Sequence, residues 1–170
     1  TSNDGSIWDL IKPHKITVFG TSASFIGASE KKRFDLNSVL SDKTVRLILS
    51  TGSPLLEHHF DYLYNSFPYS IQVGSISGGT DIVSCFALCN PLTPVRRGKI
   101  QGRGLGMDIV SWNEKKEELT NEKGELVCRN AAPCMPIYFL NDTDFTRYKS
   151  SYFKDGESKE WYHGDYIIVD

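Results

Sequence analysis

Three β-rich runs, each followed by a loop rich in glycine, serine and threonine, constrain the fold more than any other feature of this 170-residue chain. They occupy residues 15–19, 45–50 and 70–74. We expect a helix after each loop, the first over residues 22–32 with Ser22 near its cap. Strands that alternate with helices pair in parallel through right-handed crossovers. The three loops should therefore lie along one carboxyl edge of a sheet, where open α/β sheets bind ligands.

The pattern changes near residues 90–98, where two prolines and a basic, glycine-containing stretch interrupt the alternation. Beyond it the sequence predicts one helix, from about residue 142 to residue 153, and otherwise short β segments at residues 98–101, 107–112, 124–129 and 166–169. The fold class is therefore predicted as α/β. Residues 1–92 would form a parallel α/β subdomain. Residues 93–170 would form a mainly β subdomain that stops within a β run.

Charge and apolar patterning exclude several classes of partner. The 19 Lys and Arg residues nearly balance the 21 Asp and Glu residues, and neither sign forms a long run, so we expect no nucleic acid and no anionic membrane as partner. The longest apolar runs, such as residues 82–88, are too short to span a bilayer. We expect a cytosolic location (cytoplasmic) and small-molecule partners. The four cysteines are irregularly spaced and are expected to be buried or idle thiols.

The most informative loop is Ser77-Gly-Gly-Thr-Asp81, at the end of the third β run. Adjacent glycines let a backbone approach a ligand closely. A threonine hydroxyl can donate to a phosphate oxygen, and a carboxylate suits Mg²⁺, which prefers one or two protein carboxylates with ligand phosphates. The alternative is an ordinary helix cap, for which Thr and Asp are equally suited.

Two further motifs carry candidate site residues. Gly52-Ser-Pro54 follows the second β run and should border a crevice with the Ser77-Gly-Gly-Thr-Asp81 loop; its alternative is a plain strand-to-helix turn with Pro54 at the first helical position. Trp161-Tyr-His-Gly-Asp165 precedes a β run, and a carboxylate there could accept hydrogen bonds from two sugar hydroxyls. Its alternative is a surface Gly-Asp turn.

The histidines give weaker signals. His58 and His59 are adjacent, so on a helix they should point in different directions and not face one metal ion; we expect one exposed and one partly packed. His163 suggests acid–base chemistry, but no second catalytic group accompanies it in the sequence.

Taken in order, these loops resemble the nucleotide-binding motifs of the adenylate-forming superfamily, which includes the AMP-forming acyl-CoA synthetases. The matching segments are residues 50–55, 78–81, 124–127 and 161–165, at separations typical of the family. Within it, the segments 75–82, 125–128, 133–136 and 163–166 look like the branch that activates acetoacetate. The likeness runs from about residue 15 to the end. It implies that residues 1–92 are the C-terminal part of the α/β nucleotide-binding subdomain, and that residues 93–170 are a β-rich subdomain, a distorted barrel incomplete at its C-terminus.

The resemblance implies a ligase that joins ATP and acetoacetate to an acyl-adenylate with loss of pyrophosphate, after which coenzyme A displaces AMP. Its cofactors would be ATP, Mg²⁺ and coenzyme A as co-substrate, and its place would be in fatty acid and lipid metabolism. Thr80 and Asp81 would be catalytic, Thr80 at a phosphate and Asp81 at the metal. The cofactor-binding residues would be Gly52, Ser53 and Pro54 beside adenine, Ser77 where relatives carry an aromatic residue, Gly78 and Gly79 at the carboxylate end, Thr80, and Asp165 at the ribose.

The chain departs from the family in ways that limit what it would do alone. Asp81 stands where most relatives have Glu, and His163 where they have Thr. The family's phosphate loop would precede this segment, and its hinge, a ribose-binding arginine and a lysine of a mobile domain would follow it. We therefore expect the 170 residues to be part of a larger synthetase, needing the remainder for activity. The alternatives are a non-catalytic nucleotide-binding or interaction module, and a ligase for another short-chain acid.

Overall fold

A computed structural model describes residues 6–67, 69–154 and 158–170. The chain forms two compact units: unit 1 comprises residues 1–77 with 88–102, and unit 2 comprises residues 78–87 with 103–170. Each is described by itself. The division at residues 92 and 93 that the sequence suggests stays a prediction.

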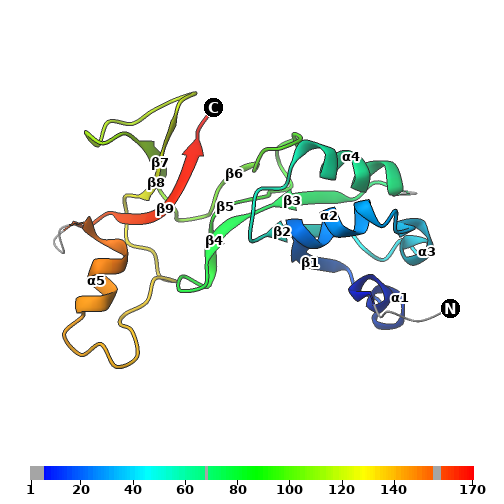
Figure 1. The fold of residues 1–170 in the computed structure, drawn as a ribbon, viewed down its shortest axis with the longest axis horizontal. Coiled ribbons are helices and arrows are strands. Elements are labelled where there is room, and N and C mark those ends of the chain that lie inside the picture. The colour runs from blue at the N-terminus through cyan, green and yellow to red at the C-terminus, as the bar shows by residue number, and fades with distance from the viewer. Residues whose placement is uncertain (1–5, 68, 155–157) are drawn as a thin grey trace. The chain divides into compact units, whose positions relative to one another are not determined.

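Unit 1 contains a parallel sheet, as the sequence predicts. Its strands β1 (Val18–Ser22), β2 (Leu47–Thr51) and β3 (Gln72–Ser75) lie in that order (Figure 1). The register aligns Ser22 with Thr51 and Ser50 with Ser75, so the strands end level with one another. The chain therefore leaves all three strands at one edge of the sheet, as expected, although α2 begins directly after β1 with no loop between them.

The first two predicted helices are present. In α2 (Ala23–Lys31), Ser22 is the cap and its hydroxyl accepts the Phe25 N–H at 3.1 Å. The second is α4 (Glu57–Ser66), which begins later than Pro54, so Pro54 is not its first helical residue. Three short helices were not predicted: η1 (Ile7–Leu10), α1 (Ile11–His14) and α3 (Leu36–Leu40).

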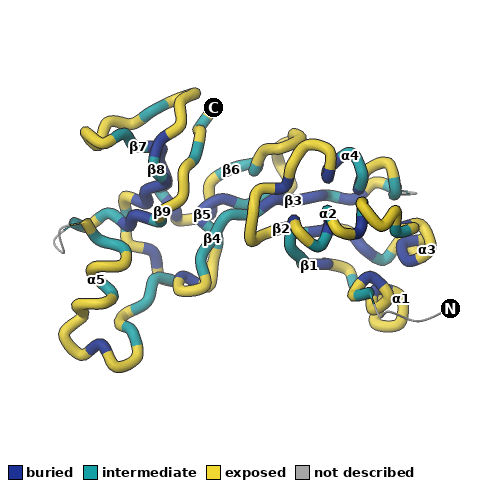
Figure 2. The backbone as a smooth tube through the Cα atoms, viewed as in Figure 1, coloured by how far each residue is buried: buried dark blue, intermediate teal, exposed yellow. Residues whose placement is uncertain are grey.

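One apolar cluster fills unit 1. It includes Ile48 of β2, Val73 of β3, and Phe60 and Leu63 of α4. Figure 2 shows buried segments concentrated along β3. Gly74 of β3 is a point of close packing, because a Cβ there would lie 2.6 Å from Sγ of Cys89. The Cys89 thiol thus occupies the space that a side chain at position 74 would need.

The predicted third helix is absent. The chain instead forms a hairpin of β4 (Ser77–Gly79) and β5 (Ser84–Leu88), which β6 (Gly102–Arg103) extends to a three-stranded sheet. A Cβ at Gly78 would collide with the backbone oxygen of Ser84. The adjacent glycines therefore permit close strand pairing where we had expected a loop leading into a helix.

The other sheet of unit 2 is antiparallel. It contains β7 (Ile109–Trp112), β8 (Lys123–Cys128) and β9 (Trp161–Ile168), in that order. The short strand expected at residues 98–101 is not formed, and β9 begins before its predicted start at residue 166. All three sheets are open, so the described residues form no closed barrel.

The remaining helix, α5 (Thr146–Tyr152), is shorter than predicted. Asp142 accepts the backbone N–H groups of Arg147 and Tyr148 at 2.9 and 2.8 Å, so it satisfies the first turn as a capping residue does. Over residues 6–67, 69–154 and 158–170, no helix combines the length and apolar character that a membrane crossing requires.

Candidate functional site

The loop after β2 lies at the carboxyl edge of the parallel sheet. Gly52 has a φ of 82°, a conformation that favours glycine, and a Cβ there would have no atom within 4 Å. Ser53 and Pro54 are exposed. The neighbouring strand continues the edge, because the Ile76 N–H donates to the Ser50 carbonyl at 2.9 Å. Gly52, Ser53 and Pro54 are thus beside the chain that leads to Ser77, within unit 1.

Thr80 and Asp81 occupy the turn between β4 and β5. The Val83 N–H donates to the Thr80 carbonyl at 3.2 Å and closes this turn. Both side chains are exposed, and Ile82 beside them is fully buried. The turn thus presents a hydroxyl and a carboxylate to solvent from an anchored backbone.

The Asp81 carboxylate has a partner 71 residues away. The hydroxyl of Tyr152, the last residue of α5, donates a hydrogen bond to Oδ2 of Asp81. Burial, reinforced by the negative charge of Asp81, raises the pKa of Tyr152 to about 12. Tyr152 is therefore a protonated donor at neutral pH.

Asp165 lies within strand β9, whereas we had expected it just before a β run. Its side chain is 68% exposed, and its Oδ2 lies 3.4 Å from Nε2 of His163. Gly164 between them has a φ of 87°. This glycine places two successive polar side chains, one mostly buried and one exposed, close enough to interact.

His163 packs inside unit 2. Its ring lies 4.8 Å from that of Phe86, and its side chain is 14% exposed. A Cβ at Gly79 would lie 3.3 Å from His163 Cε1. Gly79 thus leaves the space that the imidazole uses.

The segment 124–127 lies in β8, which pairs with β9. A Cβ at Gly124 would lie 2.5 Å from the Trp112 carbonyl oxygen, so glycine is required by the close approach of β7 and β8. Glu125 accepts from Lys154 Nζ at 2.6 Å, which raises the pKa of Lys154. Lys154 also lies over the Tyr162 ring, 4.3 Å from its centroid.

The predicted site residues divide between the two units, and within unit 2 His163 lies next to both Gly79 and Asp165. Gly78, Gly79, Thr80, Asp81 and Asp165 belong to unit 2, and Gly52, Ser53, Pro54 and Ser77 belong to unit 1. Sequence reasoning placed Tyr152 on a helix but not at the site. No local pattern marks it, because its partner is distant in sequence.

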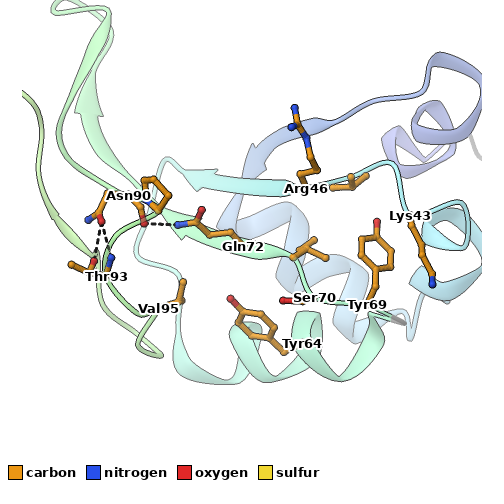
Figure 3. A pocket seen from close by; sticks show the side chains of 12 residues that line it. Lys43, Arg46, Tyr64, Tyr69, Ser70, Gln72, Asn90, Thr93 and Val95 are labelled. Carbon is orange, nitrogen blue, oxygen red and sulfur yellow. Dashed lines mark hydrogen bonds between the residues drawn. The ribbon is translucent and has the colours of Figure 1, made fainter.

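A pocket of about 630 Å³ lies elsewhere in unit 1. It is lined from the amino ends of β2 and β3 and from α4, at the sheet edge opposite the predicted loops. Figure 3 shows the Gln72 amide turned toward Asn90, whose carbonyl it reaches at 2.8 Å, and the Arg46 guanidinium pointing away from Tyr64. None of the predicted site residues lines this pocket.

The His58–His59 pair differs from expectation in one respect. His58 is exposed and His59 buried, as predicted, but Nε2 of His58 and of His59 lie 3.6 and 3.8 Å from Oε2 of Glu30. The expectation that they cannot face one ion is therefore wrong. Nδ1 of His59 accepts the Leu56 N–H at 3.3 Å, so neutral His59 carries its proton on Nε2, toward Glu30. That tautomer directs the Nε2–H of His59 toward Glu30 and disfavours ligation through Nε2.

Known proteins with similar sequences indicate the family of this chain. No protein-family model matches the chain. The chain is 46% identical over 164 residues to the acetoacetyl-coenzyme A synthetase of Rhizobium meliloti, and 42% identical over 163 residues to the acetoacetyl-CoA synthetase of Gallus gallus. Each alignment covers 96% of this chain. The chain is a homologue of one segment of the acetoacetyl-CoA synthetases.

The alignments cover 25% and 24% of these two acetoacetyl-CoA synthetases, so the chain spans about a quarter of the length of the curated relatives it matches. Its fold agrees with that of the Streptomyces lividans acetoacetyl-CoA synthetase, with a TM-score of 0.85 and 40% identity over 95% of this chain and 25% of that one.

A more distant structure shares the fold. The anthranilate CoA ligase AuaEII, solved in complex with anthranoyl-AMP, gives a TM-score of 0.74 at 15% identity, over 96% of this chain and 29% of that one. The likeness to this ligase concerns the fold alone, whereas the identities to the acetoacetyl-CoA synthetases confirm the sequence-based resemblance.

Proposed function

We propose that the protein containing this segment is an AMP-forming ligase that activates acetoacetate with ATP and transfers the acyl group to coenzyme A. The main support for this proposal is the 40% to 46% identity to acetoacetyl-CoA synthetases, including one of known structure, over nearly the whole chain. In this proposal the 170 residues contribute part of the nucleotide site and depend on the remainder of the synthetase.

Thr80 and Asp81 would act on the phosphates. The Thr80 hydroxyl is exposed on the β4–β5 turn and can donate to a phosphate oxygen. Asp81 offers a hard oxygen donor beside it, which fits Mg²⁺. Bound with Mg²⁺, ATP supplies an electrophilic phosphorus and a charge-neutralised pyrophosphate leaving group. The protein's own contribution would be to align the acid and to bind charge that develops as the bond breaks.

The remaining predicted residues would hold the nucleoside. Asp165 is exposed, and its two carboxylate oxygens can accept hydrogen bonds from neighbouring ribose hydroxyls. Gly52, Ser53 and Pro54 would border adenine, with Ser77 nearby on the same sheet edge. Gly78 and Gly79 would line the carboxylate end, although both also have a packing reason to be glycine. The cytosolic location and the place in lipid metabolism stay predictions.

The test is an assay of the natural full-length protein. Acetoacetate, ATP, Mg²⁺ and coenzyme A should give acetoacetyl-CoA and AMP in equal amounts. Acetate and propionate lack the second carbonyl of acetoacetate and are smaller by more than one methylene. They should therefore be poorer substrates in kcat/KM, by at least the roughly 10- to 200-fold that a pocket achieves for one methylene. Release of ADP, or ATP binding with no acyl-CoA product, would refute the ligase proposal. Preference for acetate would keep the reaction and change the acid.

An Asp165→Asn variant should separate the ribose role from general folding. One weakened carboxylate interaction should raise KM for ATP about tenfold, with KM for acetoacetate unchanged. The matched control is Glu114→Gln, at an exposed carboxylate of unit 2. Equal effects of the two substitutions would remove Asp165 from the site.

A further inference from the structure

Tyr152 connects two segments of unit 2 that the sequence separates. It ends α5, and its hydroxyl donates to Oδ2 of Asp81 on the β4–β5 turn. Asp81 is exposed on that turn, where a short side chain has several accessible rotamers. The hydrogen bond to Oδ2 selects among those rotamers and leaves Oδ1 available to another ligand.

The position of the Tyr152 hydroxyl is itself fixed by packing. The Tyr152 ring stacks on the indole of Trp161, with centroids 3.6 Å apart and planes 15° from parallel. Trp161 is 1% exposed, and the rings of Tyr148 and Phe153 meet it edge-on. A ring held on a buried indole can aim its hydroxyl with little freedom, as a preorganised site requires.

Trp161 also begins β9, the strand that carries Asp165. The stacked pair therefore joins the carboxylate proposed for the metal to the strand of the carboxylate proposed for the ribose. Asp81 is hydrogen-bonded to one member of an aromatic cluster, and Asp165 lies on the strand that begins with another member. The cluster is made of Phe139, Tyr148, Tyr152, Phe153 and Trp161.

We propose that Tyr152 is a positioning residue for the magnesium-binding carboxylate of Asp81. The inference rests on the proposed function, because it assumes a divalent cation with ATP at Asp81. Tyr152 touches neither the cation nor the substrate in this role. It acts through Asp81 alone.

The experiment measures equilibrium binding of ATP to the full-length protein as Mg²⁺ is varied. Tyr152→Phe keeps the stacked ring and removes the hydroxyl. It should raise the Mg²⁺ concentration for half-maximal ATP binding about tenfold, the size expected for one hydrogen bond to a charged group. ATP binding without Mg²⁺ should be unchanged. Tyr148→Phe, one turn earlier in α5 against the same Trp161, is the matched control and should match the wild type.

Asp81→Asn and the double variant complete the design. If Tyr152 acts only through Asp81, adding Tyr152→Phe to Asp81→Asn should change the magnesium requirement no further. Additive effects would overturn the proposal, as would equal losses of ATP binding with and without Mg²⁺, which indicate a merely structural role. A normal Tyr152→Phe beside an impaired Asp81→Asn would refute this inference alone. A normal Asp81→Asn would refute both the inference and the metal role in the proposed function.

Discussion

The imidazole of His163 occupies space that a side chain at Gly79 would need. The Cε1 atom of His163 lies 3.3 Å from the position of a Cβ on residue 79, and its Nε2 lies 3.4 Å from Oδ2 of Asp165. This arrangement shows how the fold accommodates a histidine at position 163. Its bulk is accommodated by the glycine of the opposite segment, and its nitrogen reaches the proposed ribose carboxylate.

A double-mutant cycle checks this relationship. Gly79→Ala should displace His163 by a few tenths of an ångström and raise KM for ATP, and His163→Thr should raise it by removing the contact with Asp165. Because threonine leaves room for the alanine methyl group, the double variant should be less impaired than the two single effects summed. Strict additivity of the KM effects would show that the two residues do not interact.

His59 should make stability depend on pH. Burial, the neighbouring His58 and Lys31 lower its pKa below the usual 6.5, while Glu30 opposes them. Below pH 6.5 the unfolded chain therefore binds a proton that folded His59 does not, so stability should fall as pH drops from 6.5 toward the lowered pKa. The melting temperature of His59→Gln, measured from pH 7.5 down to about pH 5, should fall less steeply than that of the wild type. His14→Gln, at an exposed histidine, should not change the slope; an equal change would contradict the assignment.

Val83 should be a site of stabilising substitution. Its φ is 46°, in the left-handed region that a β-branched residue disfavours, and its side chain is 88% exposed. Val83→Asn should stabilise the protein by about 1 kcal/mol, because asparagine tolerates this conformation. Val83→Thr keeps the branched shape and should give no gain in melting temperature. A gain from threonine equal to that from asparagine would assign the effect to polarity and not to backbone strain.

The cysteines should differ in reactivity. Cys128 is fully buried, and burial raises the pKa of its thiol, so little thiolate forms at neutral pH. Cys134 is only partly buried. Iodoacetamide under native conditions, followed by peptide mass spectrometry, should modify Cys134 well before Cys128. Faster modification of Cys128 would mean that β8 opens readily.

The parallel sheet of unit 1 could be predicted because its signals are local. Each strand is a short β-rich run, and Ser22 is a typical capping residue for the helix that follows β1. The hairpin of β4 and β5 could not, because Gly78 and Gly79 are equally compatible with a loop. Their role depends on how closely Ser84 and His163 approach, which no local pattern encodes.

The candidate site divides in the same way. Thr80, Asp81 and Asp165 are recognisable from motifs that occupy a few consecutive residues. Tyr152 is not, because it reads as one more aromatic residue on a helix face until the fold brings its hydroxyl to Asp81. Residues that position a catalytic group through tertiary packing are absent from any short motif.

The close packing of Gly74 against Cys89 has an evolutionary consequence. A Cβ at position 74 would lie 2.6 Å from Sγ of Cys89 and 3.2 Å from Cδ2 of Leu49. A larger residue at position 74 therefore requires a smaller residue at position 89. Among related sequences, any residue larger than glycine at position 74 should coincide with one smaller than cysteine at position 89. Positions 74 and 89 should therefore vary together, with the combined volume of their side chains nearly constant.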